Sequence, residues 1–475
     1  KVKIVIFGTG AYWNNRKKYI LDACDIVCFL DNDSSKWDKT INGINIIQPE
    51  KIVSYQFDYV VIMCKSDDQV RRQLENIGIS SSRIITYNQL RQICLREYYI
   101  QYGMKNDKDY DVVIISTALN YNGGTIAAVY AAKALQKREK RVLVCSEDCN
   151  SQLLGELLAD NMEILIAPSL PYIINTKLTG YIKKSKMVLV NVFQMLPVVC
   201  QLNGIKPVLW WIHEPSDLYT PVLQEFNQYK NSEMTSYINC IAVSGIPQKN
   251  FKEKYFKTIY KTMPYGIPDL ALLKKEYEKI NNKIIFAIVG AVVIRKAQDV
   301  FIDAIEKLNQ SELEKTEFYI IGAYGNDEFG EKILQRVSKF NNIHMLGNLR
   351  RLEMERAYPK IDVVVCPSRE DPLPIVMTEA MMYRKPCIAS DSTGTADYIK
   401  DGINGFVCKT EDSEDLCEKM RYFIHHQEKI EIMGKEARKV YEEYFTMDKF
   451  ADRLCNQMQK TIDMFNEKKM EELCR

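Results

Sequence analysis

The stretch IDVVVCPSREDPLPIVMTEAMMYR, residues 361–384, decides the fold. Its apolar run at residues 363–365 is followed by proline and serine, which predicts a buried parallel strand that ends in a loop. Beyond a charged turn, Pro372 and Pro374 predict the start of a helix that runs to about Tyr383, because proline fits the first helical turn. A strand, a loop and a helix in this order indicate an α/β domain.

The predicted helix carries one acidic residue, Glu379, close to Ile375 and Met382. A carboxylate in such apolar surroundings needs a partner, which is either a basic residue of a neighbouring helix or a bound ligand. The start of the helix, at Pro374, Ile375 and Val376, offers backbone N–H groups without helical acceptors, at the positive end of the helix dipole. This end of the helix is suited to a diphosphate.

Asp371 precedes Glu379 by eight residues, and the segment PSREDPLPIVMTEAM closely resembles that of family 4 glycosyltransferases. These are retaining enzymes with the GT-B fold and a Glu-x7-Glu signature. The resemblance implies that Glu379 accepts hydrogen bonds from the ribose diol of a sugar nucleotide and that Asp371 lies near the donor sugar. In this sequence the first acid is Asp, which is one methylene shorter than Glu. The resemblance covers about residues 110–460 and is strongest over 283–408.

The composition excludes several classes of protein. The 64 basic and 62 acidic residues nearly balance, so nucleic acid is not an expected partner. The 14 cysteines include no Cys-x2-Cys pair, which argues against a zinc site and fits a reducing compartment. No apolar run approaches the roughly 18 residues of a membrane span, and from the residues that lead into the first strand we expect no signal peptide. We therefore expect a cytoplasmic protein, with the inner face of the membrane as an alternative location, and no metal site.

Residues 1–98 read as a separate Rossmann-like accessory domain, because short apolar strands alternate with helical stretches. Gly8 and Gly10 follow the first strand, and Asp31 ends the second, which outlines a dinucleotide-binding turn with an acid placed for a ribose hydroxyl. Trp13 stands where the third glycine of that motif would be. The unit also resembles a Rossmann-like module of bacterial sugar-modifying enzymes. Nucleotide binding and a docking role both remain open for it.

The resemblance to family 4 implies two Rossmann-like domains that face each other, in addition to the accessory domain. A polar linker is expected over residues 99–108. The expected divisions are an N-terminal acceptor domain at 109–270, a C-terminal domain for the donor nucleotide sugar at 271–450, and a C-terminal helix at 451–475 that packs back on the N-terminal domain.

Two positions in the acceptor domain are candidates for the site. Gly123 and Gly124 follow its first strand, and paired glycines let the backbone approach an anion or a sugar closely. A tight turn without a ligand is the alternative. His213 leaves the carboxyl end of a strand, where α/β sheets place their ligands, and family 4 commonly has a His near the donor sugar there. A structural histidine is the alternative.

Arg295 and Lys296 lie in a predicted strand-to-helix turn. Two cations there suit a diphosphate leaving group, because they offset the charge that develops on it; two solvated charges are the alternative. The family pattern R-x4-K-G aligns Lys296 with a phosphate-binding lysine. Ala291 stands in place of its Arg and Ala297 in place of its Gly.

The resemblance implies further donor contacts in two loops. Leu349 belongs to a turn that would hold the base through backbone groups. Thr393, Gly394 and Thr395 belong to a loop that would meet the phosphates, where Asp397 replaces the family's Glu.

We therefore expect a retaining glycosyltransferase of the hexosyltransferase type. The donor would be a nucleotide-diphosphate sugar, with UDP favoured, and the acceptor a glycan, a glycolipid or a protein glycan in bacterial surface polysaccharide or glycoconjugate synthesis. No cofactor or metal is expected, because Arg295 and Lys296 take the place of the metal. Peripheral membrane contact and oligomerisation through the N-terminal domain stay open.

Two alternatives belong to other classes. The Gly8–Gly10 turn would fit a nicotinamide-dependent sugar oxidoreductase or epimerase, although the third glycine is missing and no Tyr-x3-Lys pair follows in the same unit. The substitutions at Asp371 and Ala291 would fit a non-catalytic glycosyltransferase-like subunit. Cofactor absorbance or reduction would identify the first alternative, and turnover of a sugar nucleotide would exclude the second.

Overall fold

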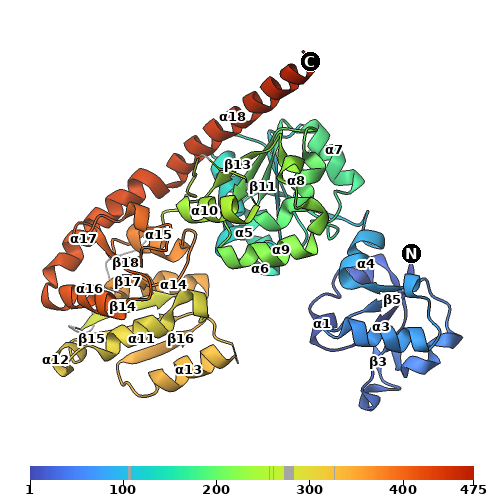
Figure 1. The fold of residues 1–475 in the computed structure, drawn as a ribbon, viewed down its shortest axis with the longest axis horizontal. Coiled ribbons are helices and arrows are strands. Elements are labelled where there is room, and N and C mark those ends of the chain that lie inside the picture. The colour runs from blue at the N-terminus through green and yellow to red at the C-terminus, as the bar shows by residue number, and fades with distance from the viewer. Residues whose placement is uncertain (105–108, 256, 260, 272–282, 326, 475) are drawn as a thin grey trace. The chain divides into compact units, whose positions relative to one another are not determined.

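The structure is a computed structural model that describes residues 1–104, 109–255, 257–259, 261–271, 283–325 and 327–474. It is a mixed α/β structure with three sheets (Figure 1), in which most of the described strand pairs are parallel and two are antiparallel. The chain forms two compact units. Unit 1 comprises residues 1–120, 142–188 and 194–202, and unit 2 comprises residues 121–141, 189–193 and 203–475.

The first sheet has the strand order β3-β4-β2-β1-β5-β6 and lies within unit 1. Its strands are β1 (Lys3–Phe7), β2 (Asp25–Leu30), β3 (Thr40–Ile41), β4 (Ile44–Ile47), β5 (Tyr59–Ile62) and β6 (Ile84–Thr86). Its helices are α1 (Ala11–Asn14), α2 (Ile20–Ala23), α3 (Asp67–Asn76) and α4 (Tyr87–Ile93). The central strands are apolar on both faces because both faces are covered. The short β3–β4 hairpin was not among the predicted elements.

The second sheet has the order β13-β12-β11-β8-β9-β10-β7. Its strands are β7 (Ile100–Tyr102), β8 (Val112–Ser116), β9 (Val142–Ser146), β10 (Glu163–Ile166), β11 (Met187–Asn191), β12 (Val208–Ile212) and β13 (Asn239–Ala242). Its helices are α5 (Gly123–Gln136), α6 (Ser151–Ala159), α7 (Thr176–Lys184), α8 (Leu196–Leu202), α9 (Tyr219–Glu225) and α10 (Gly245–Tyr255).

Strand β7 corrects the predicted linker over 99–108. Residues 100–102 pair antiparallel with residues 164–166 of β10 and so cover an edge that would otherwise expose unpaired backbone groups. The rest of the predicted linker, residues 105–108, lies outside the described residues.

The third sheet is parallel throughout, lies in unit 2 and has the order β16-β15-β14-β17-β18-β19. Its strands are β14 (Ile284–Val289), β15 (Thr316–Ile321), β16 (Ile343–Gly347), β17 (Val363–Cys366), β18 (Cys387–Ser390) and β19 (Gly405–Cys408). Its helices are α11 (Gln298–Glu306), α12 (Gln310–Leu313), α13 (Glu328–Val337), α14 (Arg351–Ala357), α15 (Ile375–Met382), α16 (Ser413–His425) and α17 (Glu428–Val440). Residues of β14, α11 and α16 contribute to its hydrophobic core, among them Phe286, Phe301 and Phe423.

In this third sheet the strand order reverses between β14 and β17. At such a switch point the loops that follow the two strands diverge and leave a crevice at their carboxyl ends, where doubly wound sheets bind ligands. The decisive stretch 361–384 supplies β17 and α15, as its pattern predicted.

The last helix, α18 (Met447–Leu473), contacts α5 and β12 within unit 2 (Figure 1). Arg138 Nη2 lies 2.7 Å from Asp452 Oδ1, and Asn239 Nδ2 donates to Thr461 Oγ1 at 2.8 Å. The helix is continuous from Met447, so the predicted division at residue 451 falls inside it. Across the described part of the chain, no helix combines the length and the apolar character that a membrane span requires.

Candidate functional site

Two basic residues and one acid meet at the switch point of the third sheet. Lys296 Nζ pairs with Asp371 Oδ2, and Arg295 Nη1 lies 3.8 Å from the same oxygen. Arg295 Nη1 also donates to the carbonyl of Glu370 at 2.9 Å. The loop after β14 thus presents both cations to the loop after β17.

The turn after β14 depends on two small residues. Gly290 has φ +149°, and a Cβ there would lie 3.4 Å from Cε of Lys296, so glycine leaves room for the lysine side chain. Ala297 has φ +57°, the left-handed conformation that favours glycine. A glycine at position 297, as in the family pattern, would adopt this left-handed conformation without strain. In this chain Ala297 adopts it instead.

The amino end of α15 follows Asp371 by a few residues. Pro374 is the residue before the helix and supplies no side-chain cap. The backbone N–H groups of Ile375 and Val376 therefore have no acceptor within the helix. Tyr265 Oη donates to the carbonyl of Leu373 at 2.7 Å, which fixes the approach to this end.

Glu379 lies on α15 and is held by a tyrosine. Tyr358 Oη donates to Glu379 Oε2 at 2.6 Å, and the Tyr358 ring stacks on Tyr383 with centroids 5.1 Å apart. Burial raises the pKa of Glu379, partly offset by the Tyr358 hydrogen bond. The partner of this acid is thus a hydroxyl group, and its other oxygen stays available for a second donor.

The loop after β18 crosses the Asp371 loop at close range. Gly394 N donates to Asp371 O at 2.8 Å, and a Cβ on Gly394 would overlap the carbonyl of Pro372. Thr393 Oγ1 donates to Ser390 O at 2.9 Å. Thr395 Oγ1 is buried and has no hydrogen-bond partner among the residues that the structure describes. Thr393, Gly394 and Thr395 therefore all belong to the loop after β18, which contacts the Asp371 loop through Gly394.

The glycine turn begins α5 in unit 2. Asn122 caps the helix by accepting from Thr125 N at 3.0 Å. A Cβ on Gly123 would lie 3.9 Å from Ile375 Cδ1, and one on Gly124 would lie 3.9 Å from Cβ of His213. The structure therefore brings the glycine turn, His213 and the first residue of α15 together.

His213 directly follows β12 and is 8% exposed. Its ring packs edge-on to Trp211, with centroids 4.3 Å apart, and its Nε2 is buried without a hydrogen-bond partner among the described residues. Burial lowers the pKa of His213 to about 3, so the imidazole is neutral at physiological pH.

The neighbouring Glu214 was not predicted as a site residue. It is 2% exposed, and burial raises its pKa to about 7. Its Oε1 accepts from Phe193 N at 2.7 Å and its Oε2 from His213 N at 2.9 Å. Glu214 therefore fixes the backbone on which His213 stands.

Leu349 is half-buried and lies after β16, which is two strands away from β14 in the sheet. The structure gives it no described contact with Lys296, Asp371 or Glu379. Its predicted role toward the base stays a prediction.

The candidate residues of the N-terminal turn lie apart, in the first sheet of unit 1. Gly8 has φ +103° and donates its N–H to Leu30 O at 2.8 Å. Gly10 begins α1, which is only four residues long. Burial raises the pKa of Asp31, but hydrogen bonds from Thr9 and Lys36 outweigh it and the net pKa is lowered.

Asp31 Oδ2 accepts from Lys36 Nζ at 2.9 Å, and its Oδ1 accepts from Asp33 N at 3.0 Å. Trp13, in the place of the third glycine, is fully buried and packs edge-on to Phe29. The acid is thus engaged by protein donors, and a large side chain fills the position where a dinucleotide motif needs glycine.

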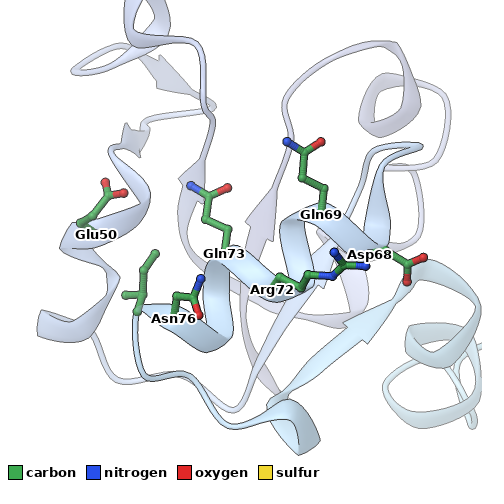
Figure 2. A pocket seen from close by; sticks show the side chains of 7 residues that line it. Glu50, Asp68, Gln69, Arg72, Gln73 and Asn76 are labelled. Atoms are coloured by element: carbon green, nitrogen blue, oxygen red, sulfur yellow. The ribbon is translucent and has the colours of Figure 1, made fainter.

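A surface hollow also lies in unit 1, along α3. Figure 2 shows the side chains that line it: Glu50, Asp68, Gln69, Arg72, Gln73, Asn76 and Ile77. None of the predicted site residues takes part in it.

Within the described part of the chain, no group of three or more His, Cys, Asp or Glu side chains is arranged to hold a metal ion. Sequence reasoning missed Tyr358 and Glu370, and named Glu214 only together with His213 as a possible base of an inverting reaction. Each of these residues contacts a partner that is distant in the sequence or contacts backbone atoms. Such contacts produce no recognisable sequence motif.

Comparison with known proteins shows which proteins this chain resembles. Residues 271–440 match the family model described as Glycosyl transferases group 1, and residues 1–85 match one described as C2185-like, N-terminal. A sulfoquinovosyl transferase of Arabidopsis thaliana is 30% identical over 159 residues, which are 33% of this chain and 29% of that protein. An uncharacterized glycosyltransferase of Methanocaldococcus jannaschii is 28% identical over 172 residues, 34% of this chain and 46% of that protein. The matched stretch spans less than half the length of either relative.

Among solved structures, HepE from Anabaena in complex with UDP and glucose has a TM-score of 0.61. It is 15% identical in sequence, and the likeness covers 74% of this chain and 100% of that chain. The predicted α/β fold of the GT-B type is confirmed.

Proposed function

We propose that this protein is a retaining glycosyltransferase. It moves a hexose from a UDP-linked sugar to a glycan, glycolipid or protein-glycan acceptor. The observation that carries the proposal is the convergence of Arg295 and Lys296 on Asp371 at the switch point of the third sheet, beside the amino end of α15. Cations and helix amides together suit a diphosphate better than either does alone.

The charge balance of this cluster supports a role in leaving-group departure. Without a donor, Asp371 neutralises Lys296 and keeps its side chain in place. With a donor, the two basic residues face additional negative charge on the diphosphate as the anomeric C–O bond breaks. Interactions that strengthen as this charge develops lower the barrier. Protein cations thus take the place of a metal ion in the proposed reaction.

Glu379 is proposed to accept hydrogen bonds from the ribose diol. Tyr358 occupies one of its oxygens and orients the carboxylate, which leaves the other for the ligand. In the same scheme Leu349 lies near the base, and Thr393, Gly394 and Thr395 lie near the phosphates. The buried hydroxyl of Thr395 has no partner within the described part of the chain, and a phosphate oxygen would supply one.

Retention of configuration is supported by the properties of His213 and Glu214. An inverting enzyme needs a general base aligned behind the anomeric carbon. A histidine with a pKa of about 3 is a weak base, and both oxygens of Glu214 are engaged by backbone N–H groups. We propose instead that the departing phosphate takes the proton from the acceptor hydroxyl, which attacks on the same face. The unpartnered Nε2 of His213 would then bind a sugar hydroxyl.

The domain roles follow from this assignment. We propose residues 109–270 as the acceptor domain, residues 271–450 as the donor domain and residues 1–98 as an accessory domain. The proposed setting is bacterial surface polysaccharide or glycoconjugate synthesis in the cytoplasm, with the inner face of the membrane and oligomerisation through the accessory domain left as alternatives. The engaged Asp31 and the buried Trp13 argue against the oxidoreductase alternative.

A panel of nucleotide sugars tests the proposal through release of the nucleoside diphosphate. We expect one or more UDP-sugars to be turned over, and Lys296→Ala to lose most of this turnover. Lys332→Ala is the matched control and should behave as the wild type, because it removes an exposed lysine from α13, a helix that accompanies the third sheet. A folded protein that turns over none of the panel would contradict the proposal.

A further inference from the structure

A group of contacts within unit 1 joins the elements of the first sheet to a turn after β9. Lys18 Nζ lies 2.9 Å from Asp148 Oδ1, and Tyr19 Oη donates to the same oxygen. Arg91, on α4, pairs through Nη2 with Glu147 Oε2. The two consecutive acids of this turn are therefore both bound by residues of the N-terminal domain.

Arg91 binds a second loop at the same time. Its Nε donates to Pro168 O at 2.7 Å and its Nη2 donates to Leu170 O, in the loop after β10. The guanidinium also lies over the ring of Tyr172, 5.0 Å from its centroid. Arg91 is 8% exposed, and a buried guanidinium with a carboxylate and two carbonyls as acceptors is held in one geometry.

The turn that these residues bind supports a third segment, residues 118–119, which follow β8. Glu147 Oε1 accepts from Ala118 N at 3.3 Å, and Asp148 O accepts from Leu119 N at 2.9 Å. Leu119 in turn pairs with Cys149 in an isolated parallel bridge. The same two acids thus bind the N-terminal domain and the segment 118–119, which leads directly into the glycine turn of the candidate site.

We propose that the N-terminal domain is a positioning element for the transfer reaction. Arg91 and Tyr19 hold the turn of Glu147 and Asp148, and this turn holds the segment that places Gly123 and Gly124. The inference rests on the proposed glycosyl transfer and assigns a role to the accessory domain, which needs no ligand of its own. Arg91 and Tyr19 are positioning residues, because they act through the turn and touch no reacting atom.

The proposal separates two measurable quantities. Free UDP would be bound by the third sheet, through Lys296 and Glu379, whereas the glycine turn would act on the sugar during transfer. Weakening the contacts of Arg91 should therefore lower kcat for the UDP-sugar and leave the affinity for UDP unchanged. A residue that only stabilised the fold would lower the melting temperature and leave kcat unchanged well below that temperature.

The test uses the full chain with four single substitutions. Arg91→Ala removes the contacts of Arg91 with Glu147, Pro168 and Leu170 but leaves those of Tyr19 with Asp148, Arg91→Lys keeps the charge, and Glu147→Gln keeps an acceptor for Ala118 N. Lys18→Ala is the matched control, because its pair with Asp148 is half-exposed and exposed pairs contribute little. We measure UDP release from the UDP-sugar that the wild type uses, and UDP binding by calorimetry.

We expect kcat to fall by about tenfold in Arg91→Ala, which corresponds to about 1.4 kcal/mol. Arg91→Lys should recover part of the loss, and Lys18→Ala should match the wild type. If Arg91→Ala does not fold, Glu147→Gln decides, with a smaller loss in the same direction. Unchanged kcat in the folded variants, or UDP affinity that falls in parallel with kcat, would overturn the proposal. A wild type that turns over no sugar nucleotide would instead overturn the proposed function.

Discussion

The carboxylate of Glu370 accepts hydrogen bonds from both the backbone N–H and the hydroxyl of Ser216, 154 residues earlier in the chain, at 2.7 and 2.5 Å. Asn250 Nδ2 on α10 donates to the same carboxylate at 2.5 Å. Glu370 directly precedes Asp371, the partner of Lys296, so these contacts join the loop after β17 to the loop after β12 that begins with His213.

Replacing Glu370 by Gln should weaken this connection. Glutamine has one acceptor oxygen for the three donors, which are the N–H and hydroxyl of Ser216 and the amide of Asn250. Its NH2 group would face those donors that the oxygen does not bind. Hydrogen bonds to charged groups are worth about 1.5–3 kcal/mol, so losing part of this set should lower kcat/KM for the donor by about tenfold. Steady-state kinetics measures the effect. Glu411→Gln is the control, because Glu411 pairs with Arg369 and is 61% exposed; equal effects of the two substitutions would refute the role of Glu370.

Glu379→Ala should weaken binding of the nucleoside diphosphate by roughly 1.5–3 kcal/mol, the scale of a charge-assisted hydrogen bond. Because burial raises the pKa of Glu379, its carboxylate protonates at a higher pH than an ordinary glutamate. Wild-type affinity should therefore weaken as the pH falls through this raised pKa, whereas Glu379→Ala should lack that dependence. Calorimetry at several pH values measures both effects. Unchanged affinity in a folded Glu379→Ala variant would remove Glu379 from the site.

His213 and Glu214 should make opposite contributions to stability between pH 4.5 and 6.5. The pKa of Glu214 rises from its ordinary 4.5 to about 7, so its contribution is fully present below pH 4.5 and is lost as the pH rises toward 7. The pKa of His213 falls from 6.5 to about 3, so its contribution is present above pH 6.5 and is lost as the pH falls. Each slope is at most about 1.4 kcal/mol per pH unit.

Denaturant unfolding of Glu214→Gln and His213→Gln across this range separates the two slopes. Relative to the wild type, Glu214→Gln should become less stable as the pH falls, because only the histidine contribution remains. His213→Gln should become relatively more stable over the same interval. Parallel curves for the two variants and the wild type would show that neither group titrates differently on folding.

Activity should persist in excess chelator, because Arg295 and Lys296 supply the positive charge that other enzymes obtain from a divalent ion. The measurement is the initial rate of UDP release with and without EDTA. A rate that is lost with EDTA and restored by manganese or magnesium would reject metal independence.

The sequence predicted most of the parallel strands because buried strands in α/β sheets are continuous apolar runs bounded by turns. The runs at 363–366, 284–289 and 112–116 all form such strands. The strand at residues 100–102 was missed because an edge strand of three residues has no pattern of its own. Its pairing with β10 is a tertiary relationship.

The candidate site divides in the same way. Lys296, Asp371 and Gly394 could be placed from motifs, because each motif sits in a loop at the carboxyl end of a strand. The partners Ser216 and Asn250 of Glu370 could not, because they depend on how separate elements pack. The Gly8–Gly10 turn had the right spacing for a nucleotide, but only the structure shows the contacts that occupy Asp31.

Proton NMR of the newly formed linkage tests the proposed retaining transfer most directly. With an α-linked UDP-sugar of the gluco type, identified in the nucleotide-sugar panel, retention predicts an α-linked product with a small coupling at the anomeric proton. His213→Ala should lower turnover but give the same anomer and bind UDP as the wild type does. A β-linked product with a large anomeric coupling would show inversion, and would contradict the mechanism in which the departing phosphate, rather than a protein base, takes the acceptor's proton.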